Sequence, residues 1–484
     1  MRLQTRLQVR AFSPDETDMV AAAALRLWAE LPMRIQGTDE LFDYLADYGC
    51  EIDGESVRFP QAVRDRVLDR IAAEKEAWLA TNTEPPWPGN DISVYTHGQA
   101  LIACDVETNE LRPATTADLE QWSHVVDALE IPSRAHPTFI PTDAPTGCSD
   151  FHAYATILLN SKRPGCVSVY SAEMLPYFIE AYNTAQGSPE AAKKNAPFAT
   201  RMWVNSPFMI TRENVEIAMD ARRLLGRPLS AAAMPVAGAA TPVTVAGQAA
   251  QTTAESLALS AITLAVDDIT TSIQTNALVM DMRAMAHRQA GPDVMLQRTA
   301  AAEMQCHFFG GWPRIWGFNA SGQTVGPQTL LEKGMGTAID IMSGARSVGC
   351  GSLACSDVGS LVQLVLDLEM ADTFAHMLRE VEISDERIDE ETILATVPGG
   401  ARFMETEHTF RHFREELWMP QFMDFRVPVA WRDSPTDMID SARAKAMDLA
   451  ATAKNQCPLS DDQTAAIRQL MDDARSQAGD TLRR

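Results

Sequence analysis

The sequence predicts an α/β fold, a (β/α)8 or TIM barrel, because short apolar segments alternate with longer helical patterns along the middle of the 484-residue chain. The predicted strands recur at the stride of a βα unit, about 30 residues or more. A doubly wound open sheet is the alternative, which the lack of an early glycine-rich strand-turn-helix segment disfavours. Strands are expected at 166–170, 202–205, 229–234, 270–276, 314–319 and 347–353, with a further one near 137–141. Helices are expected at 211–225, 248–266, 292–308, 327–343 and 358–381.

Segments on both sides of the predicted barrel complete the chain. Residues 1–110 are expected to form a mainly helical N-terminal extension, with a proline-rich break at 84–88, that packs on the barrel. The barrel itself is assigned to 111–455. Residues 456–484 form a C-terminal tail, in which an exposed helix begins at Asp461.

Composition and charge exclude several classes of protein. Hydrophobic residues make up 46% of the chain, which is ample for a core, and the net charge of −24 disfavours binding to nucleic acid or to anionic lipid. The N-terminus has arginines but no apolar stretch typical of a signal peptide. Eight scattered cysteines without a CxxC pair suit reduced thiols, so we expect a cytoplasmic protein, and a barrel of this size is expected to be a homo-oligomer.

A stretch of twenty-seven residues, 228–254, contains no charged residue. A membrane span is disfavoured because Pro228, Pro235 and Pro242 would break its helix. We expect instead a buried strand, then a loop of small residues at 235–247, and then a helix from Gln248. Small side chains would let a large, flat group come close to the backbone.

The residues expected at the carboxyl ends of the strands are polar, aromatic or very small. In a barrel these ends face the chemistry. They carry few ionisable groups, which argues against acid–base hydrolysis, whereas aromatic rings and amides suit a cationic substrate. The alternative is that most of the aromatic residues belong to the core. The residues concerned are Tyr170, Ser171, Asn205, Ser206, Gln274, Asn276, Trp316, Gly317, Phe318, Asn319, Gly349, Cys350 and Gly351.

Several motifs resemble those of the trimethylamine methyltransferase family. The most specific is AMPVAGAATPVTVAGQAAQTTAESLA at 233–258, which is similar to a P-x-x-G-x-x-x-PVT-x-AG signature followed by a small-residue helix with a glutamate. The other similar segments follow in the same order and spacing, which makes chance similarity improbable. They lie at 105–122, 141–147, 158–165, 326–353, 364–370 and 398–422.

This resemblance implies a TIM barrel that moves a methyl group from a methylated amine to the cobalt of a separate corrinoid protein. The chain has only standard residues at 344–353, where the founding enzyme carries pyrrolysine, so it resembles the non-pyrrolysine branch that includes glycine betaine methyltransferase. A quaternary ammonium leaves as a neutral amine and needs no proton donor. We therefore assign no catalytic acid or base, no metal and no permanently bound cofactor.

Candidate site residues fall into two groups. A substrate cage and its hydrogen-bonding groups are expected from Tyr95, Asn205, Trp312, Trp316, Phe318, Asn319, Gln328 and Glu332, with Tyr95 in a loop over the barrel mouth. Glu332 could offset the cation, but a solvated helix pair of Glu332 with Lys333 is the alternative. Contact with the corrinoid is expected from Gly238, Thr241, Gly349, Gly351, His408 and His412.

Three alternative functions stay open. His408 and His412, spaced i, i+4, could bind zinc in a zinc-dependent methyltransferase, with Cys350, Cys355 or Glu405 as third ligand; we expect them rather to face the corrinoid or a partner, with Arg411 and Arg414. A barrel lyase or aldolase would need a buried lysine or a metal-binding carboxylate cluster, and the sequence indicates neither. A non-catalytic subunit that binds a betaine or the corrinoid would have a similar sequence.

Overall fold

The computed structural model describes residues 9–82, 93–96, 98–129, 131, 136–311, 315–317, 319–345, 347–379, 381–400 and 402–481. Trp312, Phe318, the proline-rich break at 84–88 and the side chain of Trp316 lie outside the described residues.

The elements follow one another along the chain in three groups. The first runs α1 (Pro14–Glu30), β1 (Met33–Ile35), α2 (Asp39–Tyr48), β2 (Glu51–Asp53), β3 (Ser56–Arg58), α3 (Gln61–Thr81), β4 (Ser93–Thr96), β5 (Ile102–Cys104), β6 (Leu111–Pro113), α4 (Thr116–Ala128), α5 (Ser149–Asn160), β7 (Val167–Ser168), η1 (Ala172–Met174), α6 (Leu175–Gln186) and α7 (Ala191–Asn195). The second runs β8 (Phe198–Ala199), β9 (Met202–Val204), β10 (Met209–Ile210), α8 (Arg212–Leu225), β11 (Ala231–Ala233), β12 (Val236–Ala237), α9 (Val245–Asp267), β13 (Leu278–Asp281), β14 (Ala286–Arg288), α10 (Pro292–Phe309), β15 (Trp316–Gly317), α11 (Pro327–Met342), β16 (Ser347–Cys350), β17 (Ser352–Leu353), η2 (Ala354–Ser356), β18 (Val358–Gly359) and α12 (Leu361–Met377). The third runs α13 (Asp385–Ile388), α14 (Glu390–Gly399), η3 (Phe403–Glu405), α15 (Glu407–Glu416), α16 (Pro428–Asp433), α17 (Met438–Thr452) and α18 (Asp461–Thr481).

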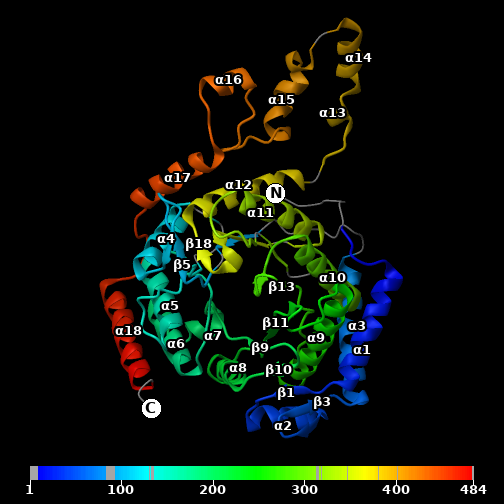
Figure 1. The fold of residues 1–484 in the computed structure, drawn as a ribbon, viewed down its shortest axis with the longest axis vertical. Helices are drawn as coiled ribbons and strands as arrows, with labels where there is room; N and C mark the ends of the chain where they lie inside the picture. The colour runs from blue at the N-terminus through cyan, green and yellow to red at the C-terminus, as the bar shows by residue number, and fades with distance from the viewer. Residues whose placement is uncertain are drawn as a thin grey trace.

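Short parallel strand pairs lie inside a ring of helices. Figure 1 shows α4, α5, α6, α8, α9, α10, α11 and α12 arranged around the strands. The parallel pairs are β7 with β8, β9 with β11, β12 with β13, β18 with β5, and the trio β15, β16 and β4. Among the described residues these ladders stay in separate sheets. A closed barrel therefore stays a prediction.

The segment before residue 110 contributes strands as well as helices. Ser13 caps α1 in a reciprocal box with Glu16, and the buried face of α1 packs on α9. Strands β1, β2 and β3 form a small sheet that β10 extends. Strand β4 pairs with β16, and Tyr95 lies opposite Gly349. This segment thus reaches the strands inside the ring of helices.

The strand predicted at 270–276 is wrong, because the extended segment there joins no neighbouring strand. Its backbone amides are bonded by side chains of the flanking helices instead. The amide of Thr271 donates to Ser260 Oγ at 3.0 Å, and the amide of Ile273 donates to Gln305 Oε1 at 2.7 Å. The strand of this unit is β13, which begins at Leu278. Polar side chains from buried helices thus satisfy donors that a strand would have paired.

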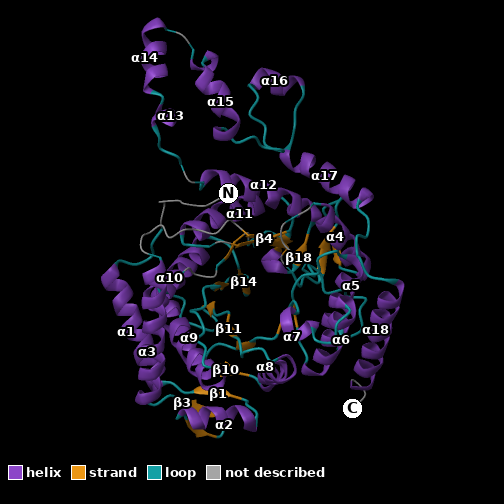
Figure 2. Cartoon of the chain, turned by 180° about the vertical axis from the view of Figure 1, so that it is seen from behind, coloured by secondary structure: helices purple, strands orange, loops and turns teal. Residues whose placement is uncertain are grey.

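The C-terminal helix is less exposed than predicted. Helix α18 packs against α5 and α6, and Ile467, Ala474 and Ala478 are buried in that contact. Helices α13 to α16 behave differently, since they project away from the ring in both views (Figures 1 and 2). No described helix combines the length and hydropathy that a bilayer crossing requires.

A buried ion pair joins α11 to α12. Lys333 Nζ lies 2.7 Å from Asp367 Oδ2, and both side chains are completely buried. Asp367 also accepts hydrogen bonds from the amide of Gly351 at 2.8 Å and from Gln363 Nε2 at 2.8 Å. The sequence indicated no buried lysine and suggested a solvated Glu332–Lys333 pair; the structure overturns both readings for Lys333. The positive charge of Lys333 is compensated by the Asp367 carboxylate, so Lys333 is unsuited to act as a free nucleophilic amine.

We predict that Lys333→Ala lowers the free energy of unfolding by about 3–5 kcal/mol, because it leaves the Asp367 carboxylate buried without its counter-ion. Urea denaturation measures the change. Lys194→Ala, at an exposed lysine in α7, is the matched control and should change stability by less than about 0.5 kcal/mol. Equal effects of the two substitutions would contradict a structural role for the pair.

Candidate functional site

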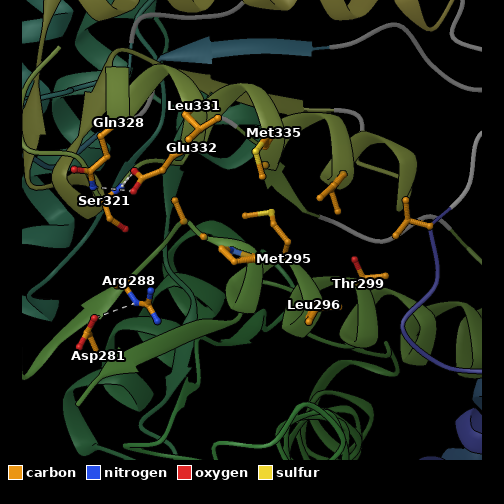
Figure 3. Close-up of a pocket in the computed structure, with 16 residues that line it drawn as sticks. Asp281, Arg288, Met295, Leu296, Thr299, Ser321, Gln328, Leu331, Glu332 and Met335 are labelled. Carbon is orange, nitrogen blue, oxygen red and sulfur yellow. Dashed lines mark hydrogen bonds and ion pairs between the residues drawn. The ribbon is translucent and has the colours of Figure 1, made fainter. Parts of the chain in front are cut away.

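A cavity of about 630 Å³ opens between α10 and α11, beside the loops that follow β13 and β15. Figure 3 shows a polar end, where Glu332 of α11 and Arg288 of β14 lie, and an apolar end with Leu296 and Met335. The cavity is lined by Val9, Asp281, Arg288, Ala290, Gly291, Pro292, Met295, Leu296, Thr299, Ser321, Gln328, Leu331, Glu332, Met335, Gly336 and Ile339. Its volume falls in the range of small-molecule sites.

Glu332 is held in one orientation by three donors. Its Oε2 accepts from the amide of Ser321 at 2.7 Å and from the amide of Gly322 at 3.0 Å. Its Oε1 accepts from Gln328 Nε2 at 2.9 Å. Gln328 and Glu332 are one turn apart on α11, so the helix presents both to the cavity, as their spacing predicts. A negative charge is therefore fixed at the polar end.

A hairpin of β13 and β14 supplies charge of both signs at the same end. Arg288 forms an ion pair with Asp293, and its Nε lies 3.7 Å from Asp281 Oδ2. Hydrogen bonds from the Arg283 side chain and from the amides of Arg283 and Ala284 lower the pKa of Asp281 to about 2. Asp281 is thus charged throughout the neutral range and orients Arg288.

The loop 354–356, which is hydrogen-bonded to this hairpin and the residue after it, has an unusual backbone. Ala354, Cys355 and Ser356 all have positive φ, at 48°, 59° and 76°. Cys355 Sγ donates to the His287 carbonyl at 3.3 Å, and Ser356 Oγ donates to Gln289 Oε1 at 3.1 Å. Non-glycine residues in this region cost on the order of 1–3 kcal/mol each, and such strain is concentrated at functional sites.

The rest of the cavity wall is apolar. Met295 and Leu296 come from α10, and Leu331 and Met335 from α11. Leu331 is 62% exposed and Met335 51% exposed, which is unusual for side chains of this size on a helix that packs in the ring. Alkyl and thioether groups next to a fixed carboxylate suit a cation that carries methyl groups.

Asp281, Arg288 and Met295 were not anticipated from the sequence. Asp281 is the last residue of β13, so its position at the carboxyl end of a strand would have marked it had that strand been placed correctly. Strand 270–276 was expected instead, which moved the predicted strand end to Gln274 and Asn276. Arg288 carried no sequence signal, because it enters through a hairpin that interrupts the βα pattern.

The predicted substrate residues whose side chains the structure describes are not assembled at one place. Tyr95 is in β4 and not in a loop over the mouth. Its ring and the His136 ring are T-shaped, with centroids 5.8 Å apart, and burial raises the pKa of Tyr95. Asn205 is exposed after β9, and Asn319 is buried after β15. Neither lines the cavity; of the predicted substrate residues whose side chains are described, Gln328 and Glu332 line it.

Two glycines expected to face a flat macrocycle are packed inside the protein. A Cβ at Gly351 would lie 2.3 Å from the Trp122 ring, and the backbone there has φ of 90°. Gly349 is buried in β16. Gly238 and Thr241 instead form a turn, closed by a 2.9 Å bond from the Gly238 amide to the Thr241 carbonyl, at the start of a largely exposed loop.

His408 and His412 lie on α15, away from the ring (Figure 1). Their rings are 4.6 Å apart, and His412 Nδ1 is 2.8 Å from Arg387 Nη1. The described residues hold no group of three or more histidine, cysteine, aspartate or glutamate side chains arranged for a metal. Cys350, one of the third ligands considered, is buried in β16.

Comparison with known families finds a match that spans almost the whole chain. The family model described as trimethylamine methyltransferase (MTTB) matches residues 3–479. No curated protein matches the chain.

Gly351→Ala should lower the unfolding free energy by about 1–3 kcal/mol or more, because the new methyl group would overlap the Trp122 ring in a strained backbone region. Thermal denaturation is the measurement. Gly334→Ala, within α11 and with open space around its Cβ, is the control and should be neutral or stabilising by up to about 1 kcal/mol. A fully stable Gly351→Ala protein would show that the Trp122 ring can move to make room for the methyl group.

Proposed function

The chain belongs to the trimethylamine methyltransferase family, and from that premise we propose that it transfers a methyl group from a betaine-like quaternary amine to the reduced cobalt of a corrinoid carried by a partner protein. Membership of the family makes the chain a methyltransferase that acts on methylated amines. The betaine class of substrate, the corrinoid partner and a closed TIM barrel are parts of the proposal.

The observation that carries the betaine assignment is the fixed Glu332 carboxylate with Arg288 at the same end of the cavity. A betaine has a permanent cation and a carboxylate in one small molecule. Glu332 would attract the cation, while Arg288 would pair with the carboxylate in the manner that guanidinium groups favour. Met295 and Met335 would contact the methyl groups.

The proposed reaction requires little proton transfer by groups of the protein. The bond between a methyl carbon and the quaternary nitrogen breaks, the electron pair stays on nitrogen, and a neutral tertiary amine leaves. A corrinoid with reduced cobalt, presented by the partner, would supply the nucleophile for the methyl group. The residues of this chain would bind and orient the substrate, which can itself contribute several kcal/mol. No acid or base among the cavity residues is required.

The loop 238–244, which is largely exposed, is the surface we propose for the approach of the corrinoid partner. It follows β12 on the carboxyl side of the strands, and Val243 in it is 60% exposed. The loop is attached to α10, which forms one wall of the cavity, through a 3.2 Å bond from Gln297 Nε2 to the Val243 carbonyl. Gly349 and Gly351 do not fit this role, because both are buried.

The eight free thiols agree with the reducing cytoplasm that we propose.

Glu332→Gln should lower kcat/KM for quaternary amines by about 10- to 100-fold, chiefly through KM, because it removes the charge while keeping most hydrogen bonds. The assay mixes the protein with cob(I)alamin and a panel of methylated amines and follows the cobalt absorbance. Glu76→Gln, at an exposed position on α3, should leave the rate unchanged. Amine binding without cobalt methylation for every amine would favour a non-catalytic binding subunit.

Arg288→Gln should separate substrates by their carboxylate. Activity toward glycine betaine should fall by at least about 10-fold, because the variant loses a charge-assisted hydrogen bond, while activity toward a quaternary amine without a carboxylate should change little. The ratio of the two kcat/KM values is the measurement, and a similar loss for both would place the carboxylate elsewhere. Circular dichroism of the variant checks that the hairpin change leaves the fold intact.

A further inference from the structure

Residues 381–431, here called the arm, expose apolar side chains on an unusual scale. The arm contains α13, α14, η3, α15 and most of α16, and it projects from the ring beyond α12 (Figures 1 and 2). Of the thirty-one exposed large hydrophobic residues in the described part of the chain, fifteen lie in the arm. They are Val381, Ile383, Ile388, Ile393, Leu394, Val397, Phe403, Met404, Phe410, Leu417, Met419, Phe425, Val427, Val429 and Trp431.

The arm has almost no core of its own. Within its described residues, 381–400 and 402–431, only Thr396 and Phe422 are buried. Helices this short are marginal in water without tertiary packing. Ile383 at 77% and Phe425 at 74% have the highest exposed fractions among the large hydrophobic residues in the described part of the chain. The arm therefore needs an apolar surface to pack against.

The root of the arm is fastened firmly to α12. The Glu369 carboxylate accepts from the amides of Gln421, Phe422 and Met423 at 2.9–3.3 Å. Trp418 Nε1 donates to Asp372 Oδ2 at 2.7 Å. At the other end, Arg379 pairs with Glu416 at 2.7 Å. These contacts direct the arm outward in a defined direction, unlike a loose tail.

We infer that the arm packs on a second copy of this chain and makes an obligate homo-oligomer. Fifteen side chains of this size at these exposures present on the order of 1,500 Å², roughly twice the ~800 Å² per partner of a standard interface. Permanent interfaces resemble a divided core, whereas a carrier that docks and leaves uses a smaller, more polar surface. The inference is independent of the proposed reaction.

Charge argues against an anionic membrane as the alternative occupant. The arm contains eleven acidic residues and five arginines in the sequence, so it would be repelled by anionic lipid. A second copy would instead bury the apolar positions and leave the charged ones at the rim. Within the arm, Arg387 already forms ion pairs with Glu382, Glu415 and Glu416.

The test compares the full chain with a variant in which residues 383–413 are replaced by a short Gly-Ser linker, which keeps Glu416, Trp418 and the contacts of Glu369. Sedimentation velocity at micromolar concentration should show the full chain as a dimer or larger and the variant as a monomer. The helical circular dichroism of the ring should persist. A monomeric full chain, or a variant that stays assembled, would overturn the inference.

A double substitution tests the same inference in case the linker variant does not fold. Leu394→Asp with Phe410→Asp should dissociate the oligomer, since both side chains are at least 66% exposed in the single chain and substitution costs that chain little. Met19→Asp, at an equally exposed position on α1, should not. Loss of transfer to a corrinoid protein by a double variant that remains assembled would assign the arm to that partner and contradict the inference.

Discussion

The contact between Lys333, Asp367 and the Gly351 amide is the constraint on which the arrangement of the site depends. Two charged groups can be buried without a large energetic cost only when they pair with each other and their other hydrogen-bonding positions are satisfied. The pair therefore fixes the rotation of α11 about its own axis. Neighbouring residues on a helix point about 100° apart. With Lys333 turned inward to α12, Glu332 is turned toward the cavity and toward the amides of the loop after β15.

A second buried pair sets the other wall of the cavity. Arg298 of α10 contacts Asp340 of α11 at 3.3 Å, and both side chains are at most 3% exposed. Burial raises the pKa of Asp340 to about 6, and Arg298 opposes that rise. Arg298 also donates to the carbonyl of Gln289, next to Arg288 on the hairpin. The two pairs together fix α11 against both neighbouring helices, and the cavity lies in the space that they leave between α10 and α11.

Apolar surface is distributed unevenly over the molecule. Small residues and alanines dominate α9, which is buried on nearly every side and carries Glu255 bonded to Ser206 and to the Phe208 amide. The arm shows the opposite distribution, with large apolar side chains and hardly any packing. A chain with a net charge of −24 keeps its single copies apart by repulsion, so a dedicated apolar element is a direct way to overcome that repulsion at one place.

The sequence alone determined the features that depend on local pattern. Helices α8, α9, α10 and α11 lie where their periodicity predicted them, and the i, i+4 spacing of Gln328 and Glu332 placed both on one face. The motifs also indicated the family that the chain-wide match shows. These signals survive because a helix and its faces are set by residues within a few positions of one another.

Tertiary structure alone decided which residues meet across long separations. Gly351 was expected at an open surface but faces Trp122, more than two hundred positions earlier, and Tyr95 was expected in a loop but lies in a strand beside β16. Segment 270–276 has the composition of a strand, yet hydroxyl and amide groups of α9 and α10 take its backbone donors. Burial and charge pairing are properties of the packed chain, and no pattern of neighbouring residues specifies which distant segment supplies the partner.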